Sequence, residues 1–130
     1  MNMEQSSSKI DVQIIVQGKG EINGEIFRHL APMTINSIIK KMPIYGRVTR
    51  LNENMINILA QLSSGAEKSR TKFSKGEIAV LHLNGSICIF LKDTLSTPRM
   101  SLIGNVTSNL EILNKIVSVD TIVIKSKRII

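Results

Sequence analysis

The side chains that could take part in catalysis are few in this sequence. It contains one cysteine, Cys88, and two histidines, His29 and His82. No group of Cys, His and Asp residues has the spacing of a metal site. No glycine-rich loop leads from a strand into a helix, as phosphate binding would need, and the Ser-centred elbow of many hydrolases is missing. We therefore expect no metal and no cofactor.

Each of these three side chains has a structural interpretation. Cys88 lies in an apolar run, where a small buried side chain is a commoner role than a nucleophile. A single cysteine also excludes a disulfide within the chain and is typical of a reducing compartment. We interpret His29 as a surface or capping residue before a helix, and His82 as an outward-facing residue of a strand.

The chain is strongly basic, with 17 Lys and Arg against 10 Asp and Glu and a net charge of +7. Such a charge keeps a protein soluble, and it is also typical of proteins that bind nucleic acid or another acidic surface. The basic loop over 68–75 and the stretch 125–128 carry much of this charge. Proteins that bind single strands usually add exposed aromatic side chains, and aromatics are only 3% of this chain. The sequence therefore predicts salt-sensitive, non-specific nucleic-acid binding at most.

Length and composition indicate one folded domain. With 130 residues, 42% of them hydrophobic, the chain can bury roughly two thirds of the surface that its unfolded form exposes. Residues 1–8 are polar, without the apolar stretch of a secretory signal, and predict a disordered tail before a domain over 9–130. With no membrane segment in view, we expect a cytoplasmic location. The many Ile and Lys with few Gln suggest a thermophilic source.

Short apolar runs separated by turn residues predict many short strands and two helices. Strands are expected over 9–16, 21–27, 44–51, 55–62, 102–106 and 119–124, with a further hairpin around Asn84-Gly85. A first helical pattern begins at Pro32, with Thr34 as the expected N-cap, and stops at Pro43. Lys40 and Lys41 fall in its last turn, where they favour the negative end of the helix dipole. Thr107 or Ser108 caps a second helix. The stretches 63–75 and 92–99 are expected to be surface loops.

The hairpin at Asn84-Gly85 is the strongest local signal. This dipeptide readily takes both positive-φ positions of a type I′ turn. The arm that follows, Ser86–Phe90, is almost entirely apolar, which predicts a strand buried on both faces. Many short strands with two helices predict a mainly β protein built as a closed barrel with helices over its ends.

In this order the segments resemble the cyclophilin barrel, and more closely the small prokaryotic cyclophilin-like family. The resemblance covers residues 10–124 and implies a closed barrel of about eight strands capped by two helices. It rests on Lys75-Gly76-Glu77-Ile78-Ala79, on Asn84-Gly85-Ser86-Ile87-Cys88-Ile89-Phe90, on the loop with Thr94, Ser96 and Pro98, and on Ile103-Gly104-Asn105-Val106 before a Leu-rich helix.

The resemblance also implies site residues. Tyr45-Gly46-Arg47-Val48 is similar to the Phe-His-Arg-Val segment that supplies the catalytic arginine of prolyl isomerases, and Asn84-Gly85-Ser86 to the segment that opens their substrate-binding strand. Arg47 would stabilise the charge that develops while the C–N bond twists against a barrier of ~18–20 kcal/mol. The candidate ligand-binding residues around it are Tyr45, Glu53, Met55, Asn84, Ser86 and Thr94.

Other positions depart from the isomerase pattern. Ile87 and Met55 stand where isomerases have glutamines, and Cys88 and Ile89 replace an aromatic pair. A proline ring would therefore lose its apolar platform and a peptide its orientation. These residues favour a cyclophilin-like domain that binds a peptide or small ligand near Arg47 with little or no isomerase activity. The alternatives are a divergent enzyme on the same scaffold, an isomerase or another kind, and weak nucleic-acid binding through the basic loops.

Overall fold

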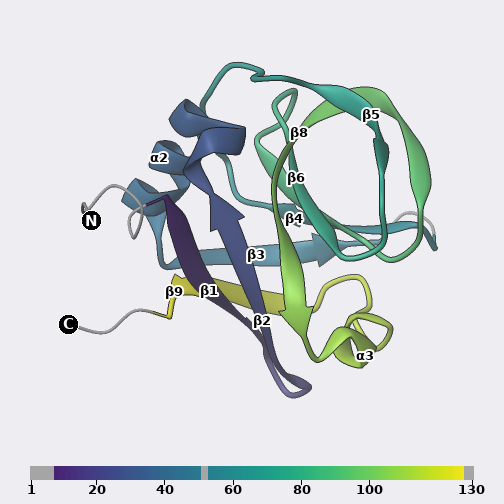
Figure 1. Cartoon of the computed structure of the whole chain (residues 1–130). Helices are drawn as coiled ribbons and strands as arrows, with labels where there is room; N and C mark the ends of the chain where they lie inside the picture. Colours follow the sequence, from purple (N-terminus) through teal and green to yellow (C-terminus); the bar gives the residue numbers. More distant parts are fainter. Residues whose placement is uncertain (1–7, 51–52, 128–130) are drawn as a thin grey trace.

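The computed structural model describes residues 8–50 and 53–127, and in them the chain forms a closed antiparallel β-barrel (Figure 1). Eight strands follow one another in the order β2-β1-β9-β3-β4-β7-β6-β8, and pairing of β8 with β2 closes the ring. The predicted mainly β fold, a closed barrel with two helices, is confirmed. The strands are β1 (Lys9–Val16), β2 (Gly20–Phe27), β3 (Ile44–Thr49), β4 (Met55–Leu59), β5 (Arg70–Phe73), β6 (Glu77–Leu81), β7 (Ser86–Phe90), β8 (Thr94–Ser108) and β9 (Thr121–Ser126). The helices are α2 (Pro32–Lys41) and α3 (Leu110–Leu113), with a short 3-10 turn η1 (Arg28–Leu30) before α2.

Branched apolar side chains fill the barrel. Alternate residues of each strand point inward, as Ile14 and Val16 do on β1 and Ile56 and Ile58 do on β4, and these four are at most 1% exposed. The cavity found among the inward side chains has a volume of only about 20 Å³, little more than one water molecule needs. An eight-stranded barrel is just wide enough for its own side chains. A ligand must therefore bind outside the barrel.

Helix α2 covers one end of the barrel, with Ile35 and Ile38 buried in the main core. The helix begins at Pro32, as predicted, but the predicted cap Thr34 is wrong, because Thr34 lies inside the helix. The residue before the helix is Ala31, whose side chain has no hydrogen-bonding atom. The carboxylate of Glu67 takes its place and accepts hydrogen bonds from the backbone of α2.

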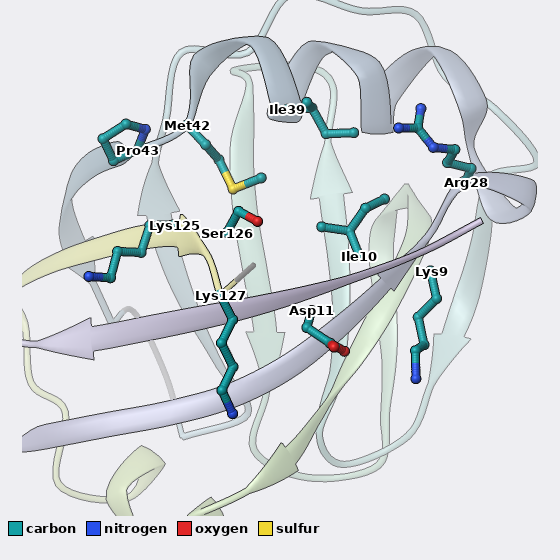
Figure 2. A pocket seen from close by; sticks show the side chains of 10 residues that line it. All are labelled: Lys9, Ile10, Asp11, Arg28, Ile39, Met42, Pro43, Lys125, Ser126 and Lys127. Atoms are coloured by element: carbon teal, nitrogen blue, oxygen red, sulfur yellow. The ribbon is translucent and has the colours of Figure 1, made fainter. Parts of the chain in front are cut away.

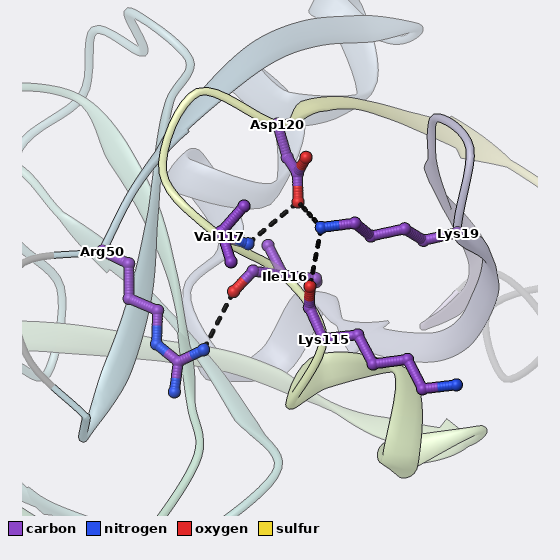
Figure 3. Close-up of polar contacts among 6 residues, drawn as sticks. All are labelled: Lys19, Arg50, Lys115, Ile116, Val117 and Asp120. Atoms are coloured by element: carbon purple, nitrogen blue, oxygen red, sulfur yellow. Dashed lines mark hydrogen bonds and ion pairs between the residues drawn. The ribbon is translucent and has the colours of Figure 1, made fainter.

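A network of hydrogen bonds holds the segment between α3 and β9 against the rest of the barrel (Figure 3). The ammonium group of Lys19 donates to Asp120 Oδ2 and to the carbonyl of Lys115, each at 2.7 Å. The guanidinium of Arg50 donates to the carbonyl of Ile116 at 2.9 Å. The turn between β1 and β2 and the end of β3 are thereby joined to the segment that precedes β9.

The strand β5 and the first half of β8 lie in stretches predicted to be loops. The expected loop over 63–75 contains β5, and the expected loop over 92–99 begins β8, which runs unbroken to Ser108. The second half of β8 pairs with β2 and β6, and its first half pairs with β5 outside the closed ring. These strands form because the outer faces of β6 and β7 are themselves apolar, and packing β5 and β8 against them removes this apolar surface from water. Ala79, Cys88 and Phe90 of that face pack against Phe73 and Met100 from the covering strands.

Strand β7 is accordingly buried on both faces, as predicted, and none of its five residues is exposed. The predicted type I′ turn is wrong. Leu81 pairs with Ser86, so residues 82–85 form a four-residue turn, and only Gly85 has a positive φ, of 71°. A side chain at Gly85 would collide with the backbone of Leu62, whose N–H donates to the carbonyl of Gly85 at 3.0 Å.

Several element ends differ from the prediction. Strand β4 ends at Leu59, β9 is shifted two residues toward the C-terminus, and Ser108 ends β8, so that Asn109 precedes α3 instead of Thr107 or Ser108. Of the predicted tail, only Ser8 is described, and its carbonyl accepts a hydrogen bond from the N–H of Arg28 at 2.8 Å. Residues 1–7, 51–52 and 128–130 lie outside the described part. No helix in the described ranges has the length and apolarity needed to span a membrane.

Candidate functional site

A groove on the outer face of the barrel brings Tyr45 and Arg47 together. Both project outward from β3, because Ile44, Gly46 and Val48 between and beside them are buried. The groove has a volume of about 570 Å³. Besides these β3 residues, it is lined by Lys41, Pro43, Leu59, Ala60, Gln61 and Thr121.

Gly46 lets β4 come close to β3 at this groove. A Cβ atom at this position would lie 2.6 Å from Cγ2 of Ile58 and 3.0 Å from the carbonyl oxygen of Leu59. Only a residue without a side chain fits that spacing. Gly46 therefore sets the separation between the two β3 side chains and Leu59 on the far wall.

The groove combines apolar walls with two cations. Tyr45 is 70% exposed and Leu59 is 49% exposed, so both side chains present apolar surface to the groove. The ammonium group of Lys41 donates to the carbonyl of Gln61 at 2.7 Å. Arg47 is exposed, and its guanidinium has no hydrogen-bond or ion-pair partner among the described residues. A free guanidinium beside apolar surface can bind a carboxylate through two parallel hydrogen bonds.

Three of the predicted ligand-binding residues lie toward the other end of β4. Glu53 is exposed and lies 3.5 Å from the ammonium of Lys92. Met55 pairs with Phe90 across the sheet and packs against the apolar cluster under β5. The hydroxyl of Thr94 donates to the carbonyl of Lys92 at 2.8 Å. None of these three described residues lines the groove at Arg47.

Asn84 and Ser86 lie one strand away from the groove. Ser86 pairs with Leu59, but its side chain is completely buried, and its hydroxyl has no hydrogen-bond partner in the described part of the chain. Asn84 is exposed in the turn, where its Oδ1 accepts a hydrogen bond from the N–H of Ser86 at 3.2 Å. Neither Asn84 nor Ser86 lines the groove.

The positions that resemble the isomerase substrate strand are inaccessible. Ile87, Cys88 and Ile89 are at most 2% exposed, because the barrel core covers one face of β7 and the β5–β8 pair covers the other. Burial raises the pKa of the Cys88 thiol to about 12. At neutral pH the thiol is protonated and has no access to a substrate, which agrees with its structural interpretation.

His82 does not project outward from a strand, as the sequence predicted. It lies half-buried in the turn, with Nδ1 2.9 Å from the carbonyl of Ser64 and Nε2 2.9 Å from the hydroxyl of Ser101. A carbonyl only accepts, so in the neutral ring Nδ1 donates and Nε2 accepts from Ser101. Ser101 is completely buried and also accepts from the N–H of Glu67 at 3.0 Å. The histidine–serine pair thus connects the hairpin to the segment that caps α2.

The residues that complete the groove were missing from the sequence prediction. Leu59 had a signal, since it is out of phase with the buried Ile56 and Ile58 on the same strand. Lys41 was assigned only to the end of the helix. No sequence pattern pointed to Thr121, because it lies in the groove only through the pairing of β9 with β3, where it stands opposite Arg47. Within the described ranges, no three His, Cys, Asp or Glu side chains gather in a way that could hold a metal ion.

Comparisons with known proteins identify the scaffold. A family model described as cyclophilin-like matches residues 10–125. The solution structure of a hypothetical protein from Archaeoglobus fulgidus is similar, with a TM-score of 0.74 and 21% identity over 91% of this chain and 95% of that one. A structure of McbB in complex with tryptophan has a TM-score of 0.76 and 10% identity, over 92% of this chain and 45% of McbB. Among curated proteins, none matches this chain. Because the two identities are only 21% and 10%, these likenesses show that the fold is shared and nothing more.

Proposed function

The chain belongs to the cyclophilin-like family, and on this scaffold we propose that it binds a small ligand or a peptide through a carboxylate in the groove at Arg47. We also propose that it has little or no prolyl isomerase activity. The first half depends on one observation: a guanidinium without a partner in the described residues stands beside the exposed side chains of Tyr45 and Leu59.

The chemistry of the groove favours an anion joined to an apolar or aromatic group. The guanidinium matches the geometry of a carboxylate, and Lys41 adds a second positive charge in the same groove. The rings and methyl groups of Tyr45 and Leu59 offer an apolar surface for the rest of the ligand. Tryptophan, present in the McbB structure, is a molecule of this type, with a carboxylate and an aromatic ring. We infer that amino-acid derivatives and peptide C-termini are the ligand class to test first.

The proposal of low isomerase activity is supported by the burial of both faces of β7. The side chains at Ile87, Cys88 and Ile89 lie between two apolar clusters, so a peptide has no route to them. These three positions, where isomerases place a glutamine and an aromatic pair, are therefore closed to a proline ring and to a peptide backbone. A divergent enzyme has less support, since neither Glu53 nor Thr94 lines the groove with Arg47.

The ligand half can be tested by calorimetric titration with N-acetyltryptophan and with its uncharged amide. We expect the acid to bind at least about tenfold more tightly, the ratio that one charge-assisted hydrogen bond of about 1.5 kcal/mol supplies. Arg47→Gln should abolish this preference, whereas Lys72→Gln, which removes an exposed charge outside the groove, should leave it unchanged. Equal binding of acid and amide, or an unaltered preference in Arg47→Gln, would refute the proposal.

The isomerase half can be tested with a protease-coupled assay on a peptide that contains Ala-Pro. We expect the rate of cis–trans conversion to stay at its uncatalysed value at micromolar protein. Robust turnover that Arg47→Ala abolishes would overturn this half. Such turnover would leave the carboxylate preference to be decided by the titration.

A further inference from the structure

A second and larger cleft lies at the end of the barrel that α2 covers (Figure 2). It opens between α2 on one side and the strands β1 and β9 on the other, and its volume is about 1020 Å³. This is the upper end of the range of about 300–1,000 Å³ found for small-molecule pockets. The cleft shares only Pro43 with the groove at Arg47.

The centre of the cleft is apolar. Ile10 from β1 and Ile39 and Met42 from α2 and its end line it, and Figure 2 shows the three side chains converging there. All three pack against the main core and remain partly exposed, so one side of each faces the cleft. These side chains form a continuous apolar surface at the barrel end, next to the buried Ile38.

Most of the charged residues that line the cleft are basic. Lys9, Arg28, Lys125 and Lys127 line the cleft, against one carboxylate, that of Asp11. Lys9 is paired with Glu25 at 3.2 Å, and Arg28 donates to an amide oxygen on α2. Within the described residues, the side chains of Lys125 and Lys127 have no hydrogen-bond or ion-pair partner.

We propose that this cleft binds an amphiphile with an anionic head group on an unbranched alkyl chain, such as a fatty acid or an alkyl phosphate. The alkyl chain lies on Ile10, Ile39 and Met42, and the head group accepts hydrogen bonds from Lys125 and Lys127. No aromatic side chain lines the cleft among the described residues, so a nucleotide base has nothing on which to stack. The site is independent of the groove at Arg47, and neither proposal depends on the other.

Calorimetric titration with octanoate, decanoate and laurate as monomers tests the apolar part. We expect one molecule per chain and an affinity that rises about fourfold for each added methylene that the cleft covers. Dodecyl phosphate and laurate together distinguish which head group is preferred. Dodecyltrimethylammonium, with the same chain and a cationic head, should bind at least about tenfold more weakly than laurate. An affinity that does not depend on chain length, or equal binding of the cationic amphiphile, would overturn the proposal.

A pair of charge-reversal variants tests the head-group site. The double variant Lys125→Glu and Lys127→Glu should weaken laurate binding at least about tenfold. The matched control Lys40→Glu and Lys115→Glu changes the net charge equally at two exposed positions outside the cleft, and should leave the affinity within about twofold. Thermal unfolding of both proteins shows that each is folded. Equal weakening in both proteins would contradict a specific site, because it would show an effect of net charge alone.

Discussion

Replacing Glu67 with Gln should destabilise α2, the helix that covers one end of the barrel. The carboxylate of Glu67 caps this helix from a distant part of the chain. Its Oε1 accepts hydrogen bonds from the hydroxyl of Thr34 at 2.7 Å and from the N–H of Thr34 at 2.8 Å. Its Oε2 accepts from the N–H of Met33 at 3.1 Å. A glutamine keeps one carbonyl oxygen for Thr34, but it turns an NH₂ group toward the N–H of Met33, so that two donors face each other.

The size of the effect can be worked out from these contacts. The substitution removes one hydrogen bond to a charged group, worth about 1.5–3 kcal/mol, and the negative charge at the start of α2, worth about 0.3–1 kcal/mol. Partial exposure of the carboxylate reduces both contributions. We therefore expect the free energy of unfolding to fall by about 2 kcal/mol at pH 7, and Tm to fall by about 5–10 °C.

The loss should depend on pH in a defined direction. Burial opposes the ionisation of Glu67, but the hydrogen bonds from Thr34 and Met33 outweigh it and lower the pKa of this carboxyl. A carboxyl whose pKa is lowered by folding stabilises the folded state fully above its unfolded pKa of about 4.3, and this stabilisation is lost as the pH falls through the folded value. The difference between the native protein and Glu67→Gln should therefore be largest at neutral pH and shrink in acid.

Urea unfolding followed by circular dichroism, from pH 7 down to about pH 2.5, measures this difference. Glu111→Gln is the matched control, since Glu111 is exposed and its carboxylate has no hydrogen-bond partner among the described residues. The control should change the free energy of unfolding by less than about 0.5 kcal/mol. If the free energies of unfolding of the native and Glu67→Gln proteins differ by the same amount at every pH, the capping argument is refuted.

Three further substitutions or reactions test other parts of the structure. Gly46→Ala should lower the free energy of unfolding by about 1–3 kcal/mol, because its Cβ would lie 2.6 Å from Cγ2 of Ile58; urea unfolding with no change would contradict the close approach of β3 and β4. Ser86→Ala should be neutral or stabilise by up to about 1 kcal/mol, because the buried hydroxyl has no partner in the described part of the chain, and a clear loss in Tm would show that it has one. Cys88 should react with an aromatic disulfide reagent only as fast as the protein unfolds, since burial raises the pKa of its thiol to about 12; rapid labelling of the folded protein would mean that β7 is accessible.

The sequence was informative wherever a pattern is local. The apolar run Ser86–Phe90 predicted burial on both faces, and the short apolar run over 9–16 predicted strand β1. The alternation on β4 also separates the outward Leu59 from its buried neighbours. Each of these signals depends on residues within a few positions of one another, and each survives in the folded chain because the local preference agrees with the position in the barrel.

The parts that could not be predicted depend on distant partners. Strand β5 has four residues with only Phe73 buried, a pattern that a loop shares, and it forms because β8 and the outer face of β7 are there to receive it. The cap of α2 comes from Glu67, more than 30 positions away, so no rule about neighbouring residues could find it. The same holds for the groove, which joins Arg47 to Thr121 through strand pairing.

The nearly solid interior of the barrel has a consequence for how this protein could change. Because branched side chains leave only about 20 Å³ inside, the packing of the barrel depends on its inward side chains, and the exposed side chains that line the two outer recesses contribute little to it. Substitutions at exposed positions such as Tyr45, Arg47, Lys125 and Lys127 can alter what is bound while the free energy of unfolding stays nearly constant. Binding preference and folding stability can therefore be varied independently, which makes this barrel a suitable scaffold for changing ligands one recess at a time.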